Sequence, residues 1–218
     1  STSAITTLDT NYAATYWPWV KILDSSVNKP TWVPPSVVLA GAISYNDKVA
    51  HEWFAPAGLN RGGLDTVIQA ARKLTHSNRD DLYESNVNPI ATFPGQGITV
   101  WGQKTLQKKA SALDRVNVRR LLIFIKKEVS KIAATTLFEQ NVQATWDNFT
   151  RSAVGVLEEV KDGLGLVDYK FILDETTTTP DLVDQNILYA KLFVKPARAI
   201  EFIALDFIIT RTGAEFPE

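Results

Sequence analysis

The strongest hydrophobic pattern in the chain lies between residues 114 and 138, in the run DRVNVRRLLIFIKKEVSKIAATTLF. When successive residues are advanced by about 100°, the helical period, six apolar residues fall within one sector about 100° wide. These six are Val118, Leu121, Leu122, Ile125, Val129 and Ile132. A stripe of this width is what a helix needs to bury one face in a domain core. The pattern therefore predicts an amphipathic helix over this run.

The basic residues of the same run fall outside the apolar stripe. One row borders the stripe and a second lies further round: Arg115, Arg119 and Lys126, then Arg120, Lys127 and Lys131. Two interpretations remain open. The basic face is either solvated, as most charged helix faces are, or it docks on an acidic partner.

The rest of the chain is predicted to mix helices with strands. A second amphipathic helix is expected over residues 143–161, with these residues facing inward: Trp146, Phe149, Val154 or Ala153, Leu157 and Val160. Short helices are expected over residues 36–45, over 77–85 with Ser77 as the N-cap, and after Thr179. Residues 12–23 fit an edge strand or a bend, and residues 64–74 fit either a strand or a short helix.

Turn and strand signals complete the pattern. Two β-prone runs, 90–93 and 98–101, flank Pro94-Gly95-Gln96-Gly97, which has the signature of a type II turn and predicts a hairpin. Strands are also expected over residues 167–173, 187–194 and 200–210. The last of these, IEFIALDFIIT, is almost continuously apolar. Such a run indicates a strand that is covered on both faces or buried in a neighbour.

Composition sets the outer limits of the interpretation. The chain has 218 residues, of which 45% are hydrophobic and 22% charged, as in ordinary globular proteins of one or two domains. The net charge of -1 shows that the basic helix is a local feature. No apolar run reaches the roughly 18 residues that span a bilayer. Cysteine and methionine are absent and the chain opens on Ser1, so we expect a processed or excised piece of a longer protein.

Candidate catalytic groups are sparse. The two histidines, His51 and His76, lie in no recognised motif, and the phosphate-binding pattern GxxxxGK[ST] is absent. Neighbouring carboxylates such as Glu158 and Glu159 lie on different sides of a helix. We therefore expect no enzyme activity, cofactor or metal. Two alternatives stay open: a nucleic-acid-binding module that uses the basic helix, and a carbohydrate-acting hydrolase suggested by the tryptophans and acidic residues.

Seven sequence blocks, in order from about Tyr12, carry a resemblance to a known family: TYWPWVKI, TWVPPSVVLAGAISYND, EWFAPAGLNRGGL, NVNPIATFPGQGITVWGQKTL, VNVRRLLIFIKKEV, FEQN and DETTTTPD. Each block alone is weak, but together and in this order they resemble the C-terminal part of the contractile tail sheath proteins of bacteriophages. The resemblance implies an α+β (mixed α/β) fold. Two main amphipathic helices would pack on a small sheet in a conserved C-terminal domain over residues 65–218. Residues 1–64 would end a larger central α/β domain.

The resemblance also implies a function and its partners. The expected role is that of a structural subunit that polymerises as stacked rings around a tail tube and powers penetration of the host envelope by contraction. Expected partners are further copies of itself, the tail tube protein, and the baseplate and tail terminator proteins, with no nucleic acid and no membrane. The expected location is the tail sheath of the virion, and the host cytoplasm during assembly.

Two sets of residues are candidate sites under this interpretation. Four basic side chains would contact an acidic tube surface, while Arg115 and Arg120 pair within the domain: Arg119, Lys126, Lys127 and Lys131. The C-terminal strand would pair with a neighbouring subunit by β-augmentation. Its candidate residues are Ile200, Phe202, Ala204, Leu205, Phe207, Ile208 and Ile209.

Overall fold

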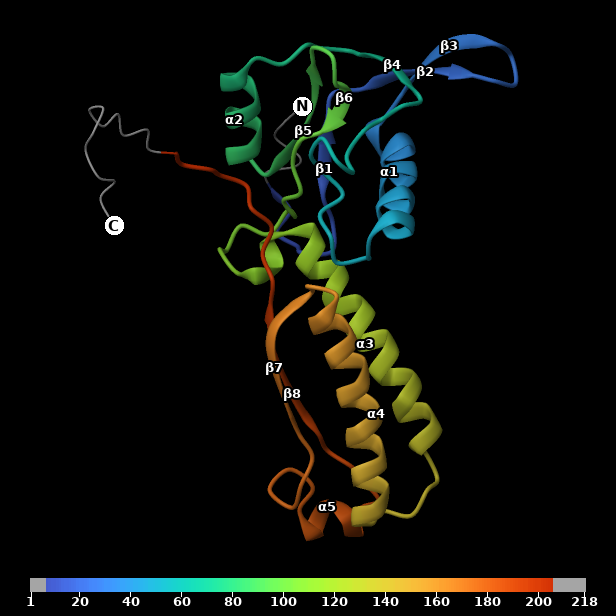
Figure 1. Ribbon diagram of the computed structural model, residues 1–218, viewed down its shortest axis with the longest axis vertical. Coiled ribbons are helices and arrows are strands. Elements are labelled where there is room, and N and C mark those ends of the chain that lie inside the picture. Colours follow the sequence, from blue (N-terminus) through green and yellow to red (C-terminus); the bar gives the residue numbers. More distant parts are fainter. Residues whose placement is uncertain (1–6, 206–218) are drawn as a thin grey trace, which may run out of the picture.

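The computed structural model describes residues 7–205, which form two lobes stacked along the long axis of the molecule (Figure 1). The upper lobe contains β1 (Thr15–Trp17), β2 (Val20–Asp24), β3 (Lys29–Val33), α1 (Pro35–Val49), β4 (Val67–Ala70), α2 (His76–Glu84), β5 (Val87–Phe93) and β6 (Gly97–Val100). The short 3-10 helix η2 (Ala112–Asp114) leads into the lower lobe. That lobe contains α3 (Val116–Thr136), α4 (Gln143–Asp162), β7 (Leu166–Ile172), α5 (Pro180–Asp184) and β8 (Lys191–Pro196). The predicted mixed α/β class is confirmed.

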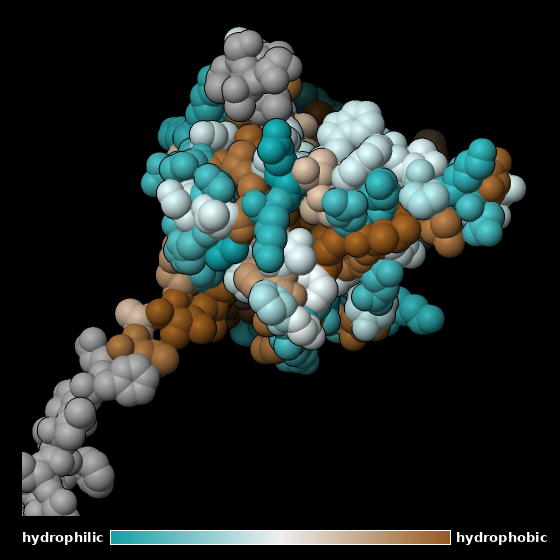
Figure 2. All heavy atoms as spheres, turned by 90° about the horizontal axis from the view of Figure 1, so that it is seen from above, coloured by the Kyte–Doolittle hydropathy of each residue, from teal (hydrophilic) through white to brown (hydrophobic). Residues whose placement is uncertain are grey.

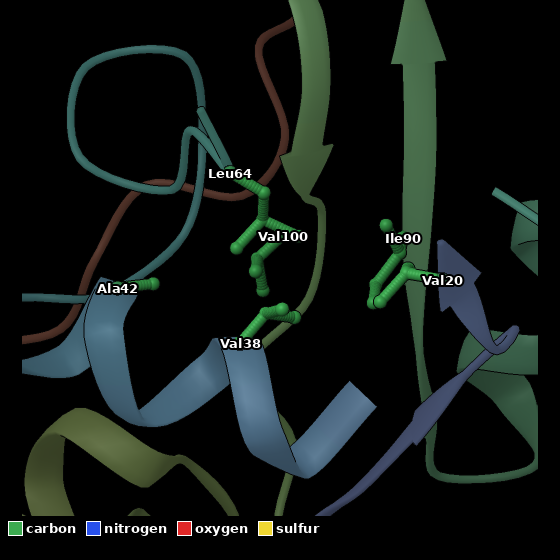
Figure 3. Packing of buried hydrophobic residues seen from close by; sticks show 6 residues of the cluster. All are labelled: Val20, Val38, Ala42, Leu64, Ile90 and Val100. Carbon is green, nitrogen blue, oxygen red and sulfur yellow. The ribbon is translucent and has the colours of Figure 1, made fainter. Parts of the chain in front are cut away.

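Two three-stranded sheets build the upper lobe. In one, β5 lies between β1, which runs parallel to it, and β6, which runs antiparallel. In the other, β2 lies between the antiparallel strands β3 and β4. Apolar side chains of both sheets meet α1 in one core, formed by Val20, Val38, Ala42, Leu64, Ile90 and Val100 (Figure 3). Burial of these side chains fixes the place of α1 against the strands.

Strand pairing crosses the expected domain division after residue 64. β4 pairs with β2, and β5 pairs with β1, so segments from both sides of residue 64 share both sheets. Leu64 itself is buried in the common core. The change from one lobe to the other instead comes after β6, in the segment that leads through η2 to α3.

The lower lobe is a helical hairpin covered by a two-stranded sheet. α3 and α4 lie side by side, and the antiparallel pair β7–β8 runs along them (Figure 1). The predicted inward face of α4 is confirmed, with Ala153 rather than Val154 as its central buried residue; the face comprises Trp146, Phe149, Ala153, Leu157 and Val160. On α3, three residues of the predicted stripe are buried: Val118, Leu121 and Ile125. Asn117, which is not part of the stripe, is buried as well.

Local signals predicted several boundaries well and others less well. The hairpin of β5 and β6 is confirmed: Gly95 has φ of 75° and the backbone N–H of Gln96 donates to the carbonyl of Phe93 at 3.1 Å. Residues 64–74, for which the pattern fitted either a strand or a short helix, contain the strand β4. α2 starts two residues earlier than predicted, because Thr75 and not Ser77 is its N-cap. The side chain of Thr75 accepts a hydrogen bond from the backbone N–H of Asn78.

A loop after α1 fastens the two lobes together. Trp53 is buried in the lower-lobe core with Leu121 and Leu157, and its indole Nε1 donates to the carbonyl of Gly163 at 2.8 Å. Its ring stacks on His51 with 4.5 Å between centroids. The upper lobe thus contributes a core residue to the lower lobe.

Among residues 7–205, no helix combines the length and apolarity that crossing a membrane requires.

Candidate functional site

The C-terminal segment exposes several apolar side chains in a row. After β8 the chain climbs past the start of α3 and then leaves the upper lobe (Figure 1). Its apolar side chains are largely exposed, with 83% of Ile200, 84% of Phe202, 78% of Ile203 and 71% of Leu205 accessible. Seen from above, the segment forms a hydrophobic stretch where it leaves the body (Figure 2). Exposure on this scale is unfavourable in water and points to a partner that covers the segment.

The predicted strand over residues 200–210 is not formed in the part that the structure describes. Ile200, Phe202, Ala204 and Leu205 lie in an extended segment without strand pairing. A strand needs a neighbouring strand for its backbone hydrogen bonds, and this segment pairs with no strand of the described chain. The remaining residues of the predicted set lie outside the described residues: Phe207, Ile208 and Ile209.

The two-stranded sheet β7–β8 offers open edges. Within the described residues each of its strands pairs only with the other, so one side of each strand carries backbone groups without a strand partner. Its inner face packs on the helices through Phe171, Leu192 and Val194. On the outer face, Val167 and Phe193 are exposed. Such an edge is able to accept another strand.

The basic residues of α3 form two groups: some contact other residues of the chain, and the others face solvent. Lys126 and Lys127 are exposed on the outer side of the helix. Lys131 is also exposed and its Nζ lies 2.7 Å from Glu128 Oε1, one helical turn away. Exposed Ile123 lies on the same helix.

Three arginines of this helix contact groups far away in the sequence. Arg120 reaches the upper lobe, where its Nη1 and Nη2 lie 2.8 and 2.6 Å from the two carboxylate oxygens of Asp47. Arg119 differs from the expectation that it is free, because its guanidinium lies 3.7 Å from the ring centroid of Tyr12. Arg115 binds Glu201 within the predicted C-terminal domain, as expected, whereas Arg120 differs from the expected intradomain pairing because Asp47 lies in the upper lobe.

These contacts shift the pKa values of the side chains that take part in them. Burial alone would raise the pKa of Asp47, but the hydrogen bonds and charge of Arg120 hold it below the ordinary value. Burial would likewise lower the pKa of Arg115, whereas the hydrogen bonds to Glu201 raise it. Burial, followed by the nearby charge of Glu201, raises the pKa of Tyr83. The lowered pKa of Asp47 and the raised pKa of Arg115 keep both groups charged across the physiological range.

The candidate catalytic groups are occupied by structural contacts. His51 stacks on Trp53, and His76 Nδ1 lies 2.8 Å from Asp80 on the surface of α2. Glu158 accepts a hydrogen bond from the hydroxyl of Tyr169. Within residues 7–205, no three acidic or histidine side chains gather closely enough to hold a metal ion.

Two contact residues had no signal in the sequence. Trp53 sits in an irregular loop with no periodic pattern, and Tyr12 lies in an aromatic cluster that indicated only general packing. Their partners, Gly163 and Arg119, are distant along the chain. Only the fold brings these pairs together.

Comparison with known families divides the chain where the two lobes meet. A model described as the phage tail sheath protein central domain matches residues 1–106, and one described as the phage tail sheath C-terminal domain matches residues 108–210. The two matches thus follow one another along nearly the whole chain.

Individual relatives agree with these matches. The tail sheath protein of Vibrio phage KVP40 is 38% identical over 97% of this chain, and that of Enterobacteria phage T4 is 36% identical over 86%. The chain spans only 30% and 28% of the lengths of these two relatives. A solved PVC sheath complex of an extracellular contractile injection system, in its contracted state, is 27% identical with a TM-score of 0.84. That match covers 94% of this chain and 58% of the solved one. The chain therefore belongs to the phage tail sheath protein family.

Proposed function

We propose that the protein is a structural subunit of a contractile phage tail sheath, which polymerises as stacked rings around the tail tube. Contraction of this polymer would drive the tube through the host envelope. The names of the relatives and the contracted sheath complex support this role. The observation that carries it is the exposed apolar segment after β8, because an extended segment with unpaired backbone groups and exposed apolar side chains favours assembly with further copies.

In this proposal the segment pairs with a neighbouring copy by β-augmentation. The open edges of β7–β8 are suited to receive it, since backbone groups there have no strand partner among the described residues. The exposed residues Val167 and Phe193 would meet the incoming apolar side chains. Main-chain hydrogen bonds would supply affinity, and alternating side chains would set the register.

The test removes the segment after Arg198. The truncated protein should fold, remain more soluble than the intact protein and fail to form tubes, as observed by negative-stain microscopy and sedimentation. Circular dichroism of the truncated protein serves as the folding control. Tubes of normal length from the folded truncation would contradict the proposal.

The exposed lysines of α3 are proposed to hold the sheath to an acidic tube surface. Lys126, Lys127 and Lys131 face solvent, whereas Arg119 is engaged with Tyr12 and would contribute less. Exposed ion pairs contribute about 0.2–1 kcal/mol each. Repetition over many identical subunits makes such weak contacts effective, and their weakness permits release during contraction.

A charge-reversal variant tests the tube contact. Changing all three lysines to Glu should leave folding and tube-free polymers intact but abolish assembly on the tail tube. A matched control applies the same reversal to three exposed lysines of the upper lobe: Lys29, Lys48 and Lys73. Wild-type assembly on tubes should weaken as salt rises. Normal assembly of the α3 variant at physiological salt would mean that this face is only solvated.

The remaining parts of the proposal concern partners and location. The proposal assigns no catalytic role to His51, which stacks on Trp53, or to His76, which lies beside Asp80. Contacts with baseplate and tail terminator proteins are a further part of this proposal, and a chain of the same fold occurs in a solved anti-feeding prophage baseplate. The protein would act in the tail sheath of the virion after assembly in the host cytoplasm.

A further inference from the structure

The C-terminal segment crosses the body between two hollows. On one side, a hollow of about 230 Å³ separates it from α2 and the end of β6; on the other, a hollow of about 380 Å³ separates it from η2 and the start of α3. Residues 199–202 line both hollows. The segment is therefore not packed into a continuous core, and few contacts hold it against the body at this point.

Glu201 makes the contacts that do hold it. Its side chain is only 18% exposed, although Ile200 and Phe202 on either side are more than four-fifths exposed. Its Oε1 lies 2.7 Å from Nε of Arg115 and its Oε2 lies 3.0 Å from Nη2. Gln103 adds a weaker hydrogen bond from Nε2 to Oε1 at 3.4 Å. A paired, bidentate geometry of this kind fixes both position and direction.

Arg115 is itself held firmly. It occupies the N-cap position of α3, between the two lobes, and its Nη1 lies 3.2 Å from Oδ1 of Asp114. Its guanidinium lies 5.8 Å from the ring centroid of Tyr83 on α2. The anchor for Glu201 therefore contacts elements of both lobes.

Backbone contacts end before this point. The N–H of Ala197 donates to the carbonyl of Gly165 at 3.0 Å. Within the described residues, the next polar tie to the body is the carboxylate of Glu201. Beyond it, the chain consists of exposed apolar side chains up to residue 205.

We propose that the Arg115–Glu201 ion pair is a pin that sets where and in which direction the C-terminal segment leaves the body toward a neighbouring copy of this chain. This inference rests on the proposed function and adds a positioning residue pair to it. A segment with a fixed exit direction samples fewer orientations, so less freedom is lost when it pairs with a neighbour. Without the pin, the segment would pivot at about residue 197, and its effective concentration at the neighbouring edge would fall.

The first test measures the direction of the segment in the unassembled chain. The natural chain has no cysteine, so spin labels can be placed at Ser44→Cys on α1 and Ala204→Cys on the segment without background. Electron–electron distance measurement should give a narrow distribution in the otherwise unchanged chain. Glu201→Gln should broaden it clearly, whereas Glu128→Gln, which neutralises an exposed pair on α3, should not. An unchanged distribution in Glu201→Gln overturns the proposal.

A double-variant comparison shows whether the two residues act through each other. Arg115→Gln and Glu201→Gln should each broaden the distribution, and the double variant should be no broader than either. A labelled pair within the body, Ser44→Cys with Ser130→Cys, should stay narrow throughout. Additive broadening in the double variant, or broadening of the body pair, would instead indicate general loosening and overturn the pin.

The second test connects the pin to assembly. Glu201→Gln should raise the protein concentration needed for half-maximal polymer about tenfold, whereas Asp47→Asn, which removes a similarly buried ion pair from the body, should not. Normal polymerisation despite a broadened distribution would overturn the link to assembly. The truncation after Arg198 distinguishes the proposed function of the segment from the proposed ion-pair pin. If the truncated chain polymerises normally while Glu201→Gln still broadens the distance distribution, the assembly role of the segment is refuted but the pin is not.

Discussion

Replacing Trp53 with Ala tests whether the two lobes of this sheath protein form one cooperative body. The indole belongs to the upper lobe in sequence but lies in the lower-lobe core, where only 6% of the residue is accessible. It stacks on His51 and meets Phe124 edge-on with 5.1 Å between centroids. Removing it would leave a cavity between the lobes.

The packing around Trp53 indicates a large effect. A Cβ added at Gly165 would lie 2.9 Å from both Cδ1 and Nε1 of the indole, so the backbone approaches the ring with no space to spare. Truncating a buried Trp to Ala costs about 3–5 kcal/mol through lost burial and the cavity left behind. Loss of the hydrogen bond to the Gly163 carbonyl is part of that cost. Trp53→Phe keeps most of the ring volume and should cost about 1–3 kcal/mol.

Urea unfolding of the 218-residue chain is the assay, followed by both far-UV circular dichroism and tryptophan fluorescence. Wild type should unfold in one transition that is shared by both probes. Trp53→Ala should lower the midpoint strongly, and two separate transitions would show that the lobes have become uncoupled. A loss below about 1 kcal/mol with an unchanged slope would refute the reasoning, because such a small effect is typical of surface positions.

Two further predictions concern single contacts. Gly95→Val should lower stability by about 1 kcal/mol or more, because φ of 75° at this turn position is unfavourable for a β-branched residue; an unchanged melting midpoint would contradict this. Asp47→Asn should lower stability at neutral pH by about 1–3 kcal/mol through loss of the charged pair with Arg120. Since the pKa of Asp47 is lowered from 3.8, the wild-type advantage should persist above that value and vanish as pH falls through the lowered pKa, which pH-dependent unfolding would detect.

The sequence determined the elements whose signals are local. Helical periodicity placed the two long helices and the buried face of α4, because a residue's exposure within a helix follows from its angle around the axis. The Pro94-Gly95 pair placed the hairpin turn, since proline favours the first central position and glycine tolerates the positive φ of the second. The ordered blocks also identified the family, because they preserve many weak local constraints together.

Only the tertiary structure decided how the basic residues are used and where the lobes divide. The carboxylates that bind Arg120 and Arg115 come from positions 73 and 86 residues away, and no periodic pattern encodes such pairing. The apolarity of residues 200–205 predicted a strand that is covered on both faces or buried in a neighbour, but in the structure these residues form no strand. Whether such a segment pairs depends on which backbone lies beside it, and that neighbour is set by the packing of the whole chain.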